Sequence, residues 1–124
     1  MRVGIIGIAC RFPGADNPRD FWNNLVAGVD SIREIPPERW DTRRYYSPNI
    51  GEANKANSKW CGLIEDIDQF DQRFFGISPR EAKNMDPQQR IVLEETWHCI
   101  EDSGIALTTL QQAKNRSVCW RHGE

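Results

Sequence analysis

Thiols and imidazoles are the side chains in this sequence that could carry covalent catalysis. They are four cysteines and two histidines, namely Cys10, Cys61, Cys99, Cys119, His98 and His122. A nucleophilic thiol needs a base within hydrogen-bond reach. His98 and Cys99 are adjacent in a predicted helix, where neighbouring side chains point about 100° apart and do not face each other. Cys10 ends an apolar run, and burial there would raise the pKa of its thiol and keep it inert. We therefore assign no catalytic residue in this sequence.

The spacing of the candidate residues argues against a structural zinc site and against a dinucleotide-binding site. Cys119 and His122 form a C-x-x-H pair, but a structural zinc site needs four ligands, and no second pair of matching spacing occurs. The widely separated cysteines also do not suggest a disulfide framework. The glycine-bearing N-terminal run fails the dinucleotide fingerprint G-x-G-x-x-G, because Ala9 and Phe12 stand where glycines are needed after Gly7. We assign no metal-binding and no cofactor-binding residue.

The elements that would position any site begin with a strand and a helix. Residues Val3–Cys10 are continuously apolar and largely β-branched, which predicts a strand buried on both faces of a mostly parallel sheet. Asn17 and Pro18 are a capping residue and a first-turn proline, and they predict a helix that ends near Ala27 before Gly28. A strand followed by a turn and a helix is typical of an α/β layer.

The middle of the chain, residues 29–77, shows no sustained periodicity. Only residues 60–64 resemble a short strand, and aromatic residues are scattered among Pro, Asn, Asp and Gly. So long a stretch without regular structure indicates a functional loop or a segment wrapped over other elements. The aromatic content argues against a disordered insert.

Two capped helices and a short tail follow. Ser78-Pro79-Arg80-Glu81 has the residues of a capping box, and Asp86-Pro87-Gln88-Gln89 repeats the pattern. The second helix is predicted from Pro87 to about Ser103, with Gly104 ending it. Its glutamates and Arg90 indicate a solvated or interfacial face without a paired-carboxylate site. Residues 117–120 start like a strand that is not completed.

The composition excludes several classes of protein. The 124 residues are 27% charged and 39% hydrophobic, as in a single folded domain. The net charge of -2 and the scattered Lys and Arg argue against nucleic-acid binding. The longest apolar run is too short to span a bilayer, and no targeting segment precedes it. We expect a cytoplasmic protein that is not associated with a membrane.

Several motifs in a fixed order resemble the opening of a β-ketoacyl synthase (ketosynthase) domain, most nearly that of a type I modular polyketide synthase. The motifs are Ile5–Ala15, Phe21-Trp22, Arg39-Trp40-Asp41, Phe74–Ala82, Met85–Arg90 and Glu101–Ile105. The resemblance implies an α/β class, with part of the layered α/β/α/β/α thiolase-like fold, incomplete in this chain. It also implies a homodimeric acyltransferase that catalyses decarboxylative Claisen condensation. The implied partners are other synthase domains and a phosphopantetheinylated acyl carrier protein, with no other cofactor.

The family carries its catalytic Cys and two His in three later motifs, which are Ala-Cys-Ser-Ser, His-Gly-Thr-Gly-Thr and Asn-x-Gly-His. None of them occurs in this sequence. Residues 1–114 are expected to be the N-terminal portion of the domain. Residues 115–124 diverge where the family has a Gly-rich strand, and we expect a truncation or frameshift there. The resemblance therefore predicts a chain that is inactive alone.

Two alternatives stay open. The first is a non-enzymatic interaction module that pairs with an intact synthase subunit or a carrier protein, and the second is a small enzyme of other chemistry. A buried-type strand without its sheet leaves apolar surface uncovered, so we predict that the isolated chain is insoluble or poorly folded. The starter unit, the extender unit and the pathway (polyketide, hybrid or fatty-acid) are set by residues outside this sequence.

Overall fold

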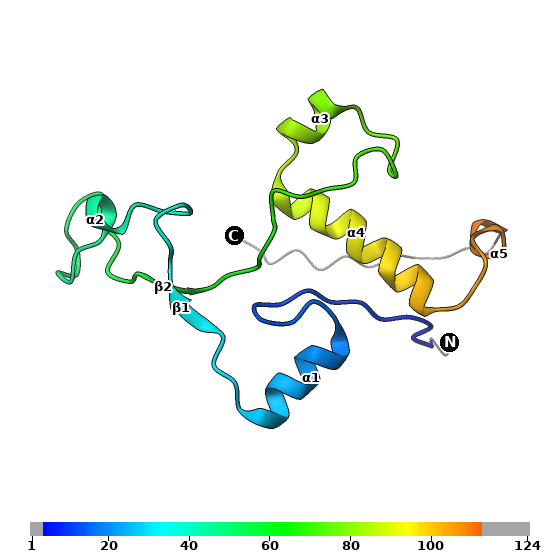
Figure 1. The fold of residues 1–124 in the computed structure, drawn as a ribbon, viewed down its shortest axis with the longest axis horizontal. Coiled ribbons are helices and arrows are strands. Elements are labelled where there is room, and N and C mark those ends of the chain that lie inside the picture. Colours follow the sequence, from blue (N-terminus) through cyan, green and yellow to red (C-terminus); the bar gives the residue numbers. More distant parts are fainter. Residues whose placement is uncertain (1–3, 113–124) are drawn as a thin grey trace.

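The structure is a computed structural model that describes residues 4–112. These residues form five helices and two short strands (Figure 1). In chain order they are α1 (Pro18–Ala27), β1 (Ile32–Glu34), α2 (Thr42–Tyr45), β2 (Trp60–Gly62), α3 (Pro79–Asn84), α4 (Pro87–Asp102) and α5 (Leu107–Gln112). None of the helices in residues 4–112 has the length and hydrophobicity of a membrane span.

Capping residues define the main helices. The Asn17 side chain accepts a hydrogen bond from Asp20 N at 2.9 Å, and Gly28 ends α1 in the left-handed region at φ 65°. Ser78 and Glu81 form a complete capping box at the start of α3. Asp86 caps α4 by accepting from Gln88 N at 2.8 Å. The sequence predictions for these three helices are confirmed, because each boundary depends on a local hydrogen bond.

The middle of the chain contains more regular structure than its lack of periodicity predicts. Strands β1 and β2 pair antiparallel, with Arg33 opposite Cys61 in the register. Between them lies α2, which is capped by Asp41, and the segment folds back so that Tyr46 bridges Ala56. The predicted strand at residues 60–64 is confirmed for Trp60–Gly62, while β1 and α2 are too short to give a sequence signal.

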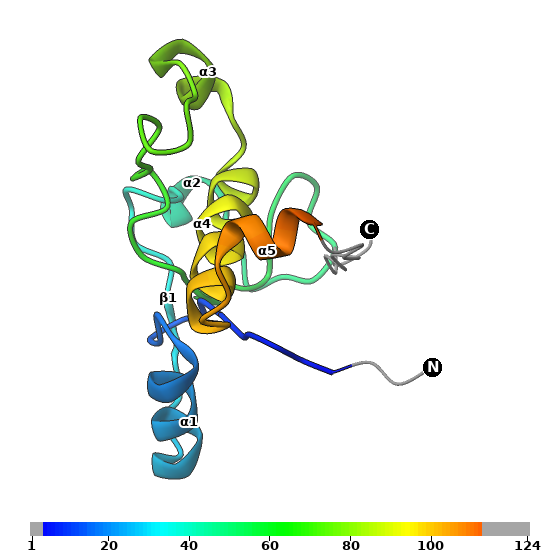
Figure 2. The same ribbon diagram turned by 90° about the vertical axis from the view of Figure 1, so that its right-hand side faces the viewer.

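The predicted N-terminal strand is not formed. The described part of that segment, residues 4–10, runs as a nearly straight stretch without strand pairing (Figure 2). It was expected to be buried, but Ile5 is 91% exposed. The physical reason is that a strand is defined by its ladder, and no other described strand lies beside this segment to supply one.

Aromatic contacts, more than a continuous core, fix the loops to α4. Phe74 meets Trp97 of α4 edge to face at 4.8 Å between ring centroids, and Phe75 stacks on Phe70 at 5.2 Å. Near the N-terminus, Phe12 packs on Phe21 of α1 at 4.5 Å. These contacts show that the aromatic residues of the irregular segments are packed, which agrees with the prediction that the middle of the chain is not a disordered insert. They leave the faces of α1 and α4 mostly open, and neither helix contains a buried residue.

Burial is accordingly sparse. Among the residues whose side chains are described, only Ala15, Ser47 and Ala82 are buried. Helix α5 was not predicted, and the predicted partial strand at residues 117–120 lies outside the described residues. Few side chains in the described part of the chain are therefore enclosed by its own elements.

Candidate functional site

The N-terminal segment crosses the C-terminal half of α4 at a single point of close backbone approach. A Cβ atom placed on Gly7 would lie 2.2 Å from the carbonyl oxygen of Cys99 and 3.1 Å from Ser103 N. One residue later, Ile8 N donates to Asp102 Oδ2 at 2.9 Å. Only glycine allows this approach, so the segment and the helix are held in one register.

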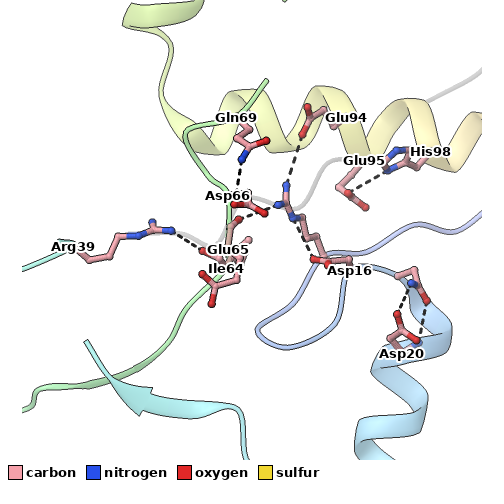
Figure 3. A network of polar contacts seen from close by, with 12 residues as sticks. Asp16, Asp20, Arg39, Ile64, Glu65, Asp66, Gln69, Glu94, Glu95 and His98 are labelled. Atoms are coloured by element: carbon pink, nitrogen blue, oxygen red, sulfur yellow. Dashed lines mark hydrogen bonds and ion pairs between the residues drawn. The ribbon is translucent and has the colours of Figure 1, made fainter. Parts of the chain in front are cut away.

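Arg11 forms the centre of a polar junction beside this crossing. Its side chain is 15% exposed, and its Nη1 lies 3.7 Å from Glu94 Oε2 of α4. Its Nε lies 3.5 Å from Asp16 Oδ1, and its Nη2 donates to the carbonyl of Glu65 at 2.9 Å. In Figure 3, dashed lines from the carboxylates of Asp16 and Glu94 reach the same side chain from different sides. One guanidinium thus joins the N-terminal segment, the loop after β2, and α4.

Two more arginines hold the loop after β2 at this junction. Arg39 Nη2 donates to the carbonyl of Ile64 at 3.0 Å, and Arg33 of β1 pairs with the carboxylate of Glu65. The loop turns at Asp66, which has a φ of 48°, and Gln69 Nε2 donates to Asp66 Oδ1 at 3.3 Å (Figure 3). The carbonyls of this irregular loop are therefore satisfied by side chains instead of by a sheet.

Arg90 plays the same part at the other end of α4. Its Nη1 donates to the carbonyl of Asp68 at 3.1 Å, and its Nη2 donates to the carbonyl of Met85 at 3.2 Å. The buried Nε atoms of Arg90 and Arg11 make no hydrogen bond, although Arg11 Nε lies within ion-pair distance of Asp16. Both guanidiniums donate to backbone carbonyls that have no partner in a β-sheet, so their role is structural.

A hollow of about 310 Å³ lies beside the junction and is the place where thiol chemistry would be sought. Its lining consists of Ile8, Ala9, Cys10, Asp16, Asn17, Pro18, Glu95, His98 and Asp102. Burial raises the pKa of the Cys10 thiol, and the negative charge of Glu95 raises it further. A raised pKa lowers the thiolate fraction, which is the opposite of what a nucleophilic cysteine requires. The sequence predicts a raised pKa for Cys10 from burial in a strand. In the structure the pKa is raised although residues 4–10 form no strand.

The imidazole in the hollow is engaged on its own helix. His98 Nδ1 lies 3.4 Å from Glu95 Oε1, and the His98 side chain is 57% exposed (Figure 3). No hydrogen bond joins it to Cys10 or Cys99 among the described contacts. The hollow brings together a thiol, an imidazole and three carboxylates, and no described hydrogen bond pairs the thiol with the imidazole.

Metal binding finds no support in the part of the chain that is described. No group of three or more His, Cys, Asp or Glu in residues 4–112 is arranged to hold an ion. The C-x-x-H pair, Cys119 and His122, lies outside the described residues. A second hollow, of about 590 Å³, opens between α3 and the start of α4 and holds no cysteine or histidine.

Comparison with known proteins identifies the family of this chain. The sequence model described as "Beta-ketoacyl synthase, N-terminal domain" matches residues 1–121. The chain belongs to the β-ketoacyl synthase family. Polyketide synthase ThaG of Burkholderia thailandensis is 52% identical over 103 residues, which is 83% of this chain and 2% of that protein. The chain thus spans a small part of the relatives that it matches.

Solved ketosynthases share its fold. The oxazolomycin ketosynthase domain OzmH KS7 of Streptomyces albus matches with a TM-score of 0.83 and 42% identity over 87% of this chain and 19% of that one. The ketosynthase from module 6 of the bacillaene synthase of Bacillus subtilis matches with a TM-score of 0.74 and 44% identity over 84% of this chain and 17% of that one. The expected partial thiolase-like α/β fold is therefore confirmed. The chain corresponds to the N-terminal part of polyketide-synthase ketosynthases.

Sequence reasoning missed the residues that build the junction. In the sequence, Arg11 stands out only as part of a family motif, Arg90 as part of a motif and of a solvated or interfacial face of its helix, and Gly7 as part of a motif and of a failed nucleotide fingerprint. A usable signal was present for Arg11, because an arginine between Cys10 and Phe12 in an apolar run must find acidic or carbonyl partners to be buried. No local signal identifies those partners, since Glu65 and Glu94 are distant in the sequence.

Proposed function

We propose that this chain is the N-terminal scaffold of a polyketide-synthase ketosynthase, and that it contributes no catalytic group of its own. One observation supports this most directly: the family motifs present here form caps, close approaches and structural ion pairs. Gly7 meets α4, Arg11 joins three segments, and Ser78 with Glu81 caps α3. The one family-motif thiol, Cys10, has a raised pKa. These motifs position elements and do not perform chemistry.

The activity proposed for the complete domain is decarboxylative Claisen condensation. A cysteine thiolate displaces the carrier thiol from an acyl thioester and holds the acyl chain as an enzyme thioester. A malonyl-type extender on an acyl carrier protein then loses carbon dioxide, and the resulting carbanion attacks that thioester and releases the cysteine thiolate. Such chemistry needs an activated thiol, basic groups and oxyanion donors. The family places them in three motifs that this sequence lacks.

A chimera tests the scaffold role. Residues 1–110 of this chain would replace the matching segment of the bacillaene module 6 ketosynthase, which is 44% identical. We expect the chimera to be acylated by an acyl thioester and to condense it with a malonyl extender at a rate within about tenfold of the parent. A chimera that melts like the parent but does not condense would contradict the proposal. The full-length chain alone should stay unacylated by intact-mass analysis, and acylation of any of its thiols would also contradict it.

The boundaries at 1–114 and 115–124 are part of the proposal. Where the family resemblance leads us to expect a Gly-rich strand, this sequence has Ser117-Val118-Cys119-Trp120-Arg121-His122, and the family model extends to residue 121. Sequencing the locus tests the frameshift hypothesis: ketosynthase-coding sequence in another reading frame downstream would support it, and its absence from all frames would contradict it.

The second candidate is a non-enzymatic module that pairs with an intact synthase subunit or a carrier protein. The observation that favours it is the apolar stripe of α1, on which Trp22 is 65% and Val26 is 71% exposed. Specific capture of an intact ketosynthase by a monodisperse sample of this chain would support the module over the scaffold.

A further inference from the structure

We draw no further inference here: the strongest candidate, the hollow between the N-terminal segment and α4 that Cys10 and His98 line, belongs to the site already described, its carboxylates are each engaged by a neighbouring group, and no described side chains there are arranged to hold an ion.

Discussion

Replacing Gly7 by alanine should detach the N-terminal segment from α4. The new Cβ would lie 2.2 Å from the Cys99 carbonyl oxygen, which is backbone and does not rotate away. The segment would have to move by about 1 Å to restore an ordinary contact in a packed region. That movement breaks the bond from Ile8 N to Asp102 Oδ2, which is 2.9 Å long.

The size of the effect follows from these two terms. Overpacking against fixed backbone costs about 1–3 kcal/mol. The solvent-exposed bond from Ile8 to Asp102 adds about 0.5 kcal/mol. A total of about 2.5 kcal/mol for local opening corresponds to roughly 70-fold faster exchange of the Ile8 amide.

Hydrogen exchange measured by mass spectrometry on the full-length chain, fused to a solubilising carrier, provides the assay. Gly4→Ala is the matched control, because its Cβ would meet nothing within 4 Å. We expect Gly7→Ala to accelerate exchange at Ile8 and Gly4→Ala to leave it unchanged. Equal exchange in the wild-type chain and in Gly7→Ala would refute the close approach and the reasoning built on it.

Three further predictions concern the junction, the hollow and the α3 cap. Arg11→Met removes the cation that joins three segments, so exchange at the same amide should rise roughly tenfold. Burial and the charge of Glu95 raise the pKa of the Cys10 thiol. Iodoacetamide at pH 8 should therefore alkylate Cys10 more slowly than the exposed Cys61, and the two rates can be followed by peptide mass spectrometry. Hydrogen bonds from the Ser78 hydroxyl and backbone lower the pKa of Glu81, so Ser78→Ala should raise that pKa in an NMR titration. Because the pKa is lower in the folded chain, the pair stabilises the fold at neutral pH, and this stabilisation is lost as the pH falls through the folded-state pKa.

Each of these has an outcome that counts against it. Arg19→Met, which changes an exposed arginine on α1, should leave the exchange rates unchanged, and an effect equal to that of Arg11→Met would show that the junction has no special role. Faster alkylation of Cys10 than of Cys61 would mean that the hollow activates the thiol. An unchanged pKa of Glu81 in Ser78→Ala would mean that the capping box does not form in solution.

The helices could be predicted because their boundaries are local. Asn17, Ser78 and Asp86 each accept from a backbone N–H two or three residues ahead, so the signal lies within one turn of sequence. Gly28 ends α1 for an equally local reason, a left-handed backbone. The short α2 has a comparable cap at Asp41, but four residues give no periodicity to detect.

The strands and the junction could not be predicted because their partners are distant. Residues 4–10 have strand composition, yet a ladder requires a neighbour that this part of the chain does not supply. Strand β1 has only three residues, and its partner β2 begins well downstream at Trp60. Likewise Arg11 reaches the carbonyl of Glu65, 54 positions away. Motif order identified the family without revealing which motif letters were structural contacts.

The pairing of β1 with β2 closes the segment between them at its base, so this segment should tolerate insertions. Ile35 N donates to the carbonyl of Lys59 at 2.8 Å, so the segment between them leaves and rejoins the molecule at the same place. Its tip is open, with Ile50 88% exposed. Closing a longer loop costs little entropy, and lengthening this one moves neither α1 nor α4. We therefore expect an inserted epitope near Ile50 to leave the pairing of β1 with β2 intact.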